Sequence, residues 1–139
     1  MQDLVKRLLA ELGEDPEREG LVMIGRRHLR SNNSWLHNVE VLVKGRDRCT
    51  LLVHPDDAAA RGIADGDMVR IHNDRGEFSV RARITDAVRP GVVVAVSVWW
   101  KKLSPDGRNA NEVTSTALAD MGGAATYYDV LVEVARAGP

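Results

Sequence analysis

One cysteine, Cys49, is all that the 139 residues contain, so the chain can form neither an intramolecular disulfide nor a cysteine-based metal site. A buried, inert thiol and a cytoplasmic location are predicted from it. The longest apolar run, residues 91–100, is far shorter than the roughly 20 residues that a membrane helix needs. Charged residues interrupt the first 12 residues, where a signal peptide would be apolar. The sequence therefore predicts neither membrane insertion nor Sec export.

An excess of one charge is also lacking, because 19 Lys+Arg stand against 20 Asp+Glu and the net charge is -1. Neither nucleic acid nor an anionic membrane is thus expected as the main partner, and any anion site must be local. The four histidines show no metal-binding spacing and have no cysteine partner, so no protein-ligated metal is predicted. A fraction of 44% apolar and 28% charged residues is typical of one soluble globular domain.

The chain divides into a short N-terminal part and one compact domain. Residues 1–12 place leucines and Val5 on one helical stripe that stops at Gly13, and the polar segment 14–20 follows as a linker. The compact domain is expected over 21–139. The helix exposes an apolar stripe that would dock on preceding domains or on a second copy of the chain, giving a homo-oligomer; a monomer with this helix disordered is the alternative.

Short apolar runs separated by turn residues predict an all-β barrel or compact sandwich for the domain. Pro55 opens a short helix that ends at Arg61, before Gly62. Residues 101–126 are polar and rich in turn formers, so this long connection is predicted to be functional, with at most a turn of helix around Ser115–Met121. The expected strands are 21–24, 50–53, 68–73, 77–84, 92–98 and 127–134.

The best-defined motifs lie between residues 54 and 92. They read His54-Pro55-x-Asp57-Ala58, Gly62-Ile63, Asp65-Gly66-Asp67-x-Val69, Asn73-Asp74-Arg75-Gly76 and Val88-x-Pro90-Gly91-Val92. This pattern resembles the C-terminal dinucleotide-binding domain of molybdopterin oxidoreductases of the dimethyl-sulfoxide reductase and formate dehydrogenase type. The resemblance covers residues 21–134 and continues through Gly25-Arg26-Arg27, Asn33-Ser34-Trp35, His37-Asn38, Trp99, Asn109-x-Asn111, Thr114 and Asp120.

The resemblance implies a mainly β fold, a double-psi β-barrel like that of aspartate decarboxylase, with short helices. It implies a molybdopterin guanine dinucleotide cofactor, in bis form in the parent enzyme. Molybdenum or tungsten would then be held by the cofactor and by preceding domains. Those preceding domains are the expected partners. The isolated domain is expected to have no catalytic residues and no redox activity of its own.

A pterin dinucleotide offers a pyrophosphate, base edges and flat rings, so its site needs cations, amides or carboxylates, and aromatic groups. Five of the six aromatic residues lie in or beside the loops that supply such side chains. The predicted cofactor-binding residues are Arg26, Arg27, His28, Ser34, Trp35, His37, Asn38, Trp99, Asn109, Asn111, Thr114, Asp120 and Tyr127.

Several of these signals have a purely structural alternative. Arg26 and Arg27 could be a solvated pair at a strand end, Trp35 a hydrophobic anchor, and the two asparagines at 109 and 111 turn formers. Trp99 and Trp100 are adjacent, so one of them is expected in the core. His54 is expected to cap its helix. The motifs at 65–66 and 74–76 are interpreted as turns that act only in folding.

Two other functions compete with cofactor binding. A self-processing decarboxylase on the same barrel cleaves its chain at a Gly-Ser bond, and this sequence has no Gly-Ser dipeptide. A double-psi barrel adaptor would use the 101–126 loop to bind a protein or peptide partner. Related domains often carry His-Gly where this chain has Ser97-Val98, so the resemblance does not extend to polar contacts from that turn.

Overall fold

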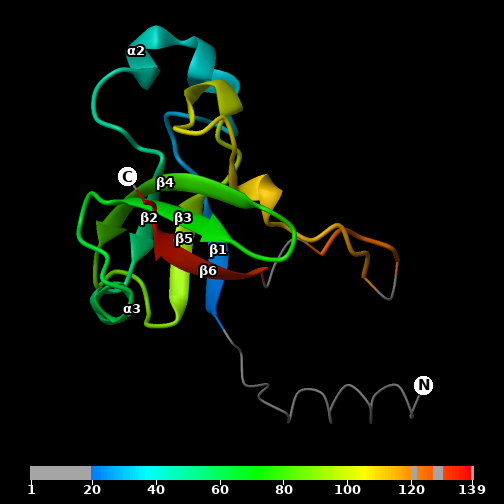
Figure 1. Cartoon of the computed structure of the whole chain (residues 1–139). Coiled ribbons are helices and arrows are strands. Elements are labelled where there is room, and N and C mark those ends of the chain that lie inside the picture. The colour runs from blue at the N-terminus through cyan, green and yellow to red at the C-terminus, as the bar shows by residue number, and fades with distance from the viewer. Residues whose placement is uncertain (1–19, 120–121, 127–129, 139) are drawn as a thin grey trace.

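The computed structural model describes residues 20–119, 122–126 and 130–138, so the helix expected over 1–12 and most of its linker lie outside the described residues. Within the described part, six strands close into a barrel (Figure 1). The strands are β1 (Leu21–Arg26), β2 (Thr50–Val53), β3 (Met68–His72), β4 (Glu77–Ile84), β5 (Val92–Val96) and β6 (Val130–Arg136). Short helices lie between them: η1 (Trp35–Asn38), α2 (Glu40–Val43), α3 (Pro55–Ala60), η2 (Lys101–Leu103) and η3 (Ala110–Glu112).

The order of strands around the barrel is β1-β5-β2-β4-β3-β6. Two pairs, β1 with β5 and β2 with β4, run parallel, and the other four contacts are antiparallel. Parallel neighbours need long crossover connections, which is why chain segments with helices separate the paired strands. This topology agrees with the predicted double-psi barrel with short helices.

The barrel interior is filled by aliphatic side chains. Phe78, Val80 and Ala82 alternate with exposed or half-buried residues along β4, and β5 is buried at every position after Val92. Leu51 and Ile71 have no exposed surface. Cys49 belongs to this core, and burial raises the pKa of its thiol to about 12, so the thiol stays protonated as predicted.

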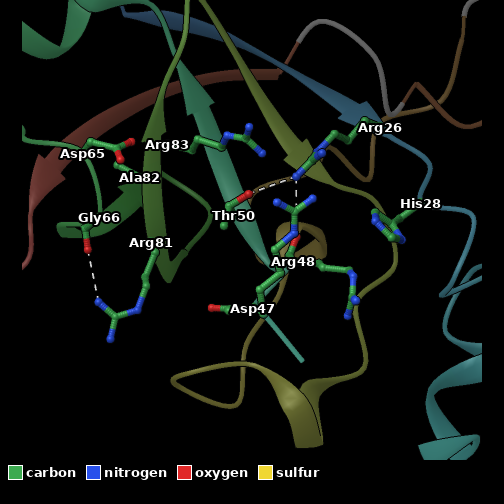
Figure 2. Close-up of a pocket in the computed structure, with 11 residues that line it drawn as sticks. Arg26, His28, Asp47, Arg48, Thr50, Asp65, Gly66, Arg81, Ala82 and Arg83 are labelled. Carbon is green, nitrogen blue, oxygen red and sulfur yellow. Dashed lines mark hydrogen bonds between the residues drawn. The ribbon is translucent and has the colours of Figure 1, made fainter. Parts of the chain in front are cut away.

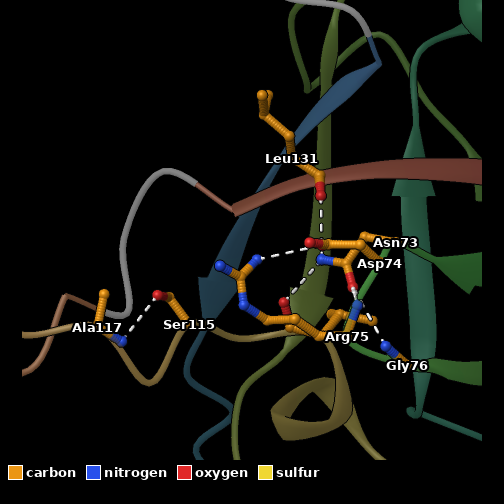
Figure 3. Close-up of polar contacts among 8 residues, drawn as sticks. Asn73, Asp74, Arg75, Gly76, Ser115, Ala117 and Leu131 are labelled. Carbon is orange, nitrogen blue, oxygen red and sulfur yellow. Dashed lines mark hydrogen bonds and ion pairs between the residues drawn. The ribbon is translucent and has the colours of Figure 1, made fainter.

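The recognisable turn motifs hold the barrel together through side-chain-to-backbone hydrogen bonds. The amide of Asn73 donates to the carbonyl oxygens of Val113 (2.8 Å) and Leu131 (3.2 Å), and its Oδ1 accepts from the N–H groups of Arg75 and Gly76 (Figure 3). One side chain thus joins the β3–β4 turn to β6 and to the loop after η3.

Two further motif residues have similar roles. Asp65 Oδ1 accepts from the N–H of Ile84 at 2.8 Å. His54 Nδ1 accepts from the N–H of Asp56 at 3.2 Å, which caps α3 as predicted. The contacts give these motifs a direct part in folding.

Several predicted boundaries were wrong by a few residues. β1 continues to Arg26, so this arginine lies in the strand and not after it, while β5 ends at Val96. Helix α2 was not expected, because its four residues carry no helix signal. The helical turn around 115–121 is wrong for its described residues: 115–119 are not helical, and Leu118 forms a β-bridge with Ala125.

The polar connections gather at one end of the barrel. Figure 1 shows α2 and the segments before it together with the segment after β5 at one end, and α3 at the other. The predicted cofactor-binding residues that the structure describes all come from these gathered connections or from the strand ends that lead into them. Across the described ranges, no helix is both long and apolar enough to cross a membrane.

Candidate functional site

The loop after β1 has an unusual backbone. Asn32, Asn33 and Ser34 all have positive φ angles, of 39°, 56° and 73°. Such conformations cost free energy for residues other than glycine and cluster at functional sites. The buried Ser31 supports the loop, because its hydroxyl and its N–H both bond to the carbonyl of His28. The loop is therefore folded by its own contacts, and it presents Trp35 with 80% of its surface exposed.

His37 lies at the centre of this surface. Its ring packs edge-on against Trp99 at 4.4 Å between centroids and stacks with Trp100 at 6.5 Å. The Nδ1 atom accepts the N–H of Trp100 at 3.3 Å, which places the ring proton on Nε2. Burial lowers the pKa of His37, so the ring is neutral at pH 7. Nε2 is buried and has no hydrogen-bond partner among the described residues.

Asn109 contacts the same group of side chains through the backbone of Trp99. It is buried, its amide donates to the carbonyl of Trp99 at 2.8 Å, and its Oδ1 accepts from the N–H of Asn111 at 3.1 Å. Thr114 then donates to the carbonyl of Asn111. Trp99 is buried and Trp100 is 36% exposed, which confirms that one of the pair is core. We call the assembly of residues 27–38, Trp99, Trp100 and 109–114 the loop face.

A hollow of about 300 Å³ adjoins the loop face at the end of β1 (Figure 2). Figure 2 shows Arg26 and Arg83 facing each other across it, above Thr50, while Arg81 turns toward Gly66. We call this hollow the arginine cleft. Its lining residues are Arg26, His28, Arg46, Asp47, Arg48, Thr50, Asp65, Gly66, Arg81, Ala82 and Arg83.

The electrostatics of the arginine cleft reflect crowded positive charge. Burial lowers the pKa of Arg26, and the charge of Arg83 lowers it further. Burial also lowers the pKa of His28, with added effects of Arg26 and Arg48 among the neighbouring arginines. Arg26 Nη2 donates to Thr50 Oγ1 at 3.0 Å, but its buried Nε has no partner in the described part of the chain. An anion would relieve both the repulsion and the unpaired donor.

The structure separates the predicted residues into two groups. His37, Trp99 and Asn109 contact one another directly or through backbone atoms, whereas Arg26 and His28 belong to the arginine cleft. Arg27 is exposed and hydrogen-bonds Asn33 within the loop. Trp35, Asn38 and Asn111 are exposed, and Ser34 is half-buried. Asp120 and Tyr127 lie outside the described residues.

A dinucleotide fits these residues. Among the described residues, the buried Nε2–H of His37 and the buried Nε of Arg26 are donors without a partner, and Trp35 has 80% of its surface exposed. These are the hydrogen-bonding, cationic and stacking groups that a pterin dinucleotide needs. Among the described residues, no group of three or more His, Cys, Asp or Glu is placed to hold a metal ion.

Sequence reasoning missed Arg48, Arg81 and Arg83. The available signal was the alternation in β4, where Arg81 and Arg83 flank the buried Ala82 and therefore point outward. That signal could not reveal the cleft, because only the parallel pairing of β2 with β4 sets Thr50 beside Arg81.

Comparisons with known proteins agree with this architecture. The family described as "Molydopterin dinucleotide binding domain" matches residues 21–131. A putative dimethyl sulfoxide reductase catalytic protein of Halobacterium salinarum is 40% identical over 108 residues, which are 78% of this chain and 13% of that protein. The dimethyl sulfoxide/trimethylamine N-oxide reductase of Rhodobacter capsulatus is 55% identical over 58 residues, 42% of this chain and 7% of that enzyme.

A solved structure shows the same fold. Acetylene hydratase from Pelobacter acetylenicus superposes with a TM-score of 0.73 at 16% identity, over 94% of this chain and 22% of that chain. The chain thus spans only a small part of the proteins it matches. The predicted fold, the relationship to the dimethyl-sulfoxide reductase type and the molybdopterin guanine dinucleotide as cofactor are confirmed. The chain belongs to the molybdopterin dinucleotide-binding domain family.

Proposed function

We propose that the loop face is the surface that holds the dinucleotide, and that this chain closes one side of the cofactor in a larger molybdenum oxidoreductase. The observation that carries the proposal is the buried His37 Nε2–H, which lacks a partner among the described residues. The His37 ring stacks with the partly exposed Trp100, and η1, which carries His37, also carries the exposed Trp35. A buried donor without a partner is costly unless a ligand supplies the acceptor.

These residues would make different contacts with the cofactor. His37 donates from Nε2 to an acceptor on the cofactor, and Trp35 and Trp100 cover its flat rings. Asn38 and Asn111 have exposed amides with no side-chain hydrogen bond in the described part of the chain, and these would bind a base edge. Asn109, Trp99 and Thr114 are positioning residues, because their polar atoms already bond to the loop backbone.

When bound, the cofactor supplies the metal at which the redox reaction occurs. The chain itself binds and orients the dinucleotide and shields one side of it from water. The names of the relatives favour a parent that reduces sulfoxides or N-oxides; a formate dehydrogenase parent stays a prediction. The preceding domains of that parent would bind against the loop face.

Two further expectations belong to this proposal. A cytoplasmic location is supported by the single, protonated Cys49, and fractionation of cells that produce the parent enzyme would test it. A homo-oligomer through residues 1–12 is the other expectation. Light scattering of the 139-residue chain with and without these residues would test it.

The cofactor proposal is tested by titrating the 139-residue chain with GDP while following backbone amide shifts. We expect the shifts to concentrate in residues 27–38 and 97–114. Trp35→Ala should lower the affinity about tenfold, since loss of base stacking costs about 1–3 kcal/mol. His37→Phe, which keeps a flat ring against Trp99, should lower it by a similar factor because the Nε2 donor is lost.

Leu131→Ala is the matched control. Leu131 lies in β6, outside the loop face, with 39% of its surface exposed, so its truncation should leave the GDP affinity unchanged. Shifts scattered over the barrel, or equal losses for Leu131→Ala and Trp35→Ala, would contradict the proposal. A protein partner that binds through residues 101–126 without any effect of nucleotide would favour the adaptor function instead.

A further inference from the structure

The arginine cleft carries positive charge that the surrounding protein does not neutralise. Of its lining residues, Arg26, Arg46, Arg48, Arg81 and Arg83 are cationic and only Asp47 and Asp65 are acidic. Both aspartates bond to backbone N–H groups, Asp47 to Cys49 at 2.9 Å and Asp65 to Ile84 at 2.8 Å. Within the described ranges, none of the five arginines forms an ion pair with a carboxylate.

Five of the eight described arginines outside the cleft behave differently, whereas Arg27, Arg30 and Arg89 also have no carboxylate partner among the described residues. Arg61, Arg70, Arg75, Arg108 and Arg136 each lie within 4 Å of an aspartate or glutamate oxygen. The net charge of the whole chain is -1, so carboxylates are abundant. Carboxylate pairing is therefore common among the other arginines, and a general excess of basic residues would not explain why none of the five cleft arginines has it among the described residues.

Neutral oxygens hold several of the cleft arginines in place. Arg26 donates to Thr50 Oγ1, Arg48 donates to the carbonyl oxygens of Val43 and Lys44, and Arg81 donates to that of Gly66 at 3.1 Å. These acceptors orient the guanidinium groups without cancelling their charge. Arg26 also keeps a buried Nε without a partner among the described residues. A preorganised cluster of this kind is suited to a compact ligand with several negative oxygens.

The position and size of the cleft limit the kind of ligand that it can bind. Arg26 ends β1 and His28 follows it, so the cleft opens beside the first residues of the loop face. A hollow of about 300 Å³ can take a small anion but not a folded domain. A guanidinium group is planar and can bind two phosphate oxygens at once through two parallel N–H groups. Neighbouring arginines can therefore hold two adjacent phosphates in the same way.

We propose that the arginine cleft binds a diphosphate group, with Arg26, Arg48 and Arg83 as its principal ligands. This inference rests on the proposed function, because it assumes that a phosphate-bearing ligand approaches the loop face. The diphosphate could come from the dinucleotide held there or from a separate phosphate compound. Both sources share the chemistry that the cleft recognises.

Calorimetric titration of the 139-residue chain with inorganic pyrophosphate tests the inference at a fixed ionic strength of about 0.15 M. We expect binding that Arg83→Gln and Arg48→Gln each weaken about tenfold, the usual effect of removing one charge-assisted hydrogen bond. Arg89→Gln is the matched control, because Arg89 is an exposed arginine outside the cleft. The pyrophosphate affinity of this variant should stay within about twofold of that of the unchanged chain. Circular dichroism would check that each variant is folded.

GDP and citrate separate the remaining explanations. GDP that binds at least tenfold more tightly than pyrophosphate, and loses that advantage in Trp35→Ala, identifies the diphosphate as part of the dinucleotide. If GDP and pyrophosphate bind with equal affinity and Trp35→Ala changes neither, the diphosphate belongs to a separate phosphate compound. Either of these two results supports diphosphate binding in the cleft. Citrate binding as tightly as pyrophosphate would overturn the inference in favour of a carboxylate partner, such as an acidic segment of another domain.

Three other results would also overturn it: no pyrophosphate binding at millimolar concentration, equal losses for Arg89→Gln and Arg83→Gln, or GDP binding that Arg83→Gln leaves unchanged. If GDP still shifts the loop face in Arg83→Gln, the proposed function stands without the cleft. If pyrophosphate binding depends on Arg83 but GDP causes no shifts in the loop face, the cleft stands and the proposed function falls.

Discussion

The β3–β4 hairpin and the loop face both carry many polar side chains, but these side chains are satisfied to different degrees. In the hairpin, Asn73 makes four hydrogen bonds to backbone atoms, and the flanking Asp65 bonds to Ile84. In the loop face, His37 keeps a buried donor without a partner among the described residues, and three successive residues have positive φ angles. The first region is stabilised by its polar groups, whereas the second keeps strain and unused donors.

This difference explains why the proposed binding surface does not coincide with the most recognisable motif. Turn chemistry is demanding in residue type, since it requires asparagine, aspartate or glycine at fixed positions. It therefore leaves a clear pattern in the sequence. A binding surface assembled from several loops leaves a weaker one, because its residues are brought together only by the fold.

The largest expected effect tests how much of the stability comes from the barrel interior. Leu51→Ala should lower the free energy of unfolding by about 3 kcal/mol, because Leu51 is fully buried and the change leaves a cavity. Leu52→Ala, in the same strand but half-buried on the outer face, should cost clearly less. Urea unfolding measures both. Equal losses would show that the barrel interior does not dominate stability.

Gly76→Ala should disturb a close contact between the hairpin and the loop face. A Cβ at Gly76 would lie 2.7 Å from the backbone carbonyl oxygen of Glu112, which cannot move without shifting η3. We expect a loss of about 2 kcal/mol in unfolding free energy, as for overpacked sites, together with amide shifts at 109–113. A variant with wild-type stability would show that the hairpin and η3 move apart freely.

Acid should weaken the loop face before it weakens the hairpin. Burial lowers the pKa of His37 in the folded chain below its unfolded value near 6.5, so the folded state binds the proton less readily. The stability from this neutral ring is complete above about pH 6.5 and is lost as the pH falls through the folded pKa. Thermal unfolding at pH 7.5 and 5.5 should show a Tm lower by a few degrees at pH 5.5.

His37→Phe supplies the control for this pH effect. The variant cannot be protonated at position 37, so its drop in Tm between the two pH values should be smaller than that of the parent chain. His28, whose pKa is also lowered, remains in both proteins and contributes equally to both drops. Identical drops would assign the pH effect to other groups.

The smallest expected effect is a gain. Val98 has a φ of 51°, a conformation that is unfavourable for a β-branched residue. Val98→Gly should relieve the strain and raise the unfolding free energy by about 0.5–1 kcal/mol after the entropy of glycine in the unfolded chain is allowed for. Val98→Ala also shortens the side chain, but alanine lacks the backbone freedom of glycine, so this variant should gain less stability. A loss of stability in Val98→Gly would mean that its side-chain packing outweighs the strain.

Most of the barrel could be predicted from local patterns. Alternation along residues 77–84 places Phe78, Val80, Ala82 and Ile84 on one face of the strand, and the structure buries the first three and half-buries Ile84. Turn residues mark the ends of the hairpin strands. Errors fell where tertiary contacts override local signals. Residues 115–119 form part of a β-bridged segment instead of a helix, and β1 reaches Arg26 because its register with β5 continues to Val96.

The sequence by itself determined the family, the β-barrel and the loops that carry the polar and aromatic side chains, since motifs and strand periodicity are local properties. The tertiary structure decided which of those side chains remain available to a ligand. The side chain of Asn109 is hydrogen-bonded to Trp99 and Asn111, whereas the Nε2 donor of His37 has no partner among the described residues. Only the tertiary structure places Arg83 of β4 near Arg26 of β1, because β5 and β2 lie between these strands in the non-sequential order β1-β5-β2-β4 of the closed barrel.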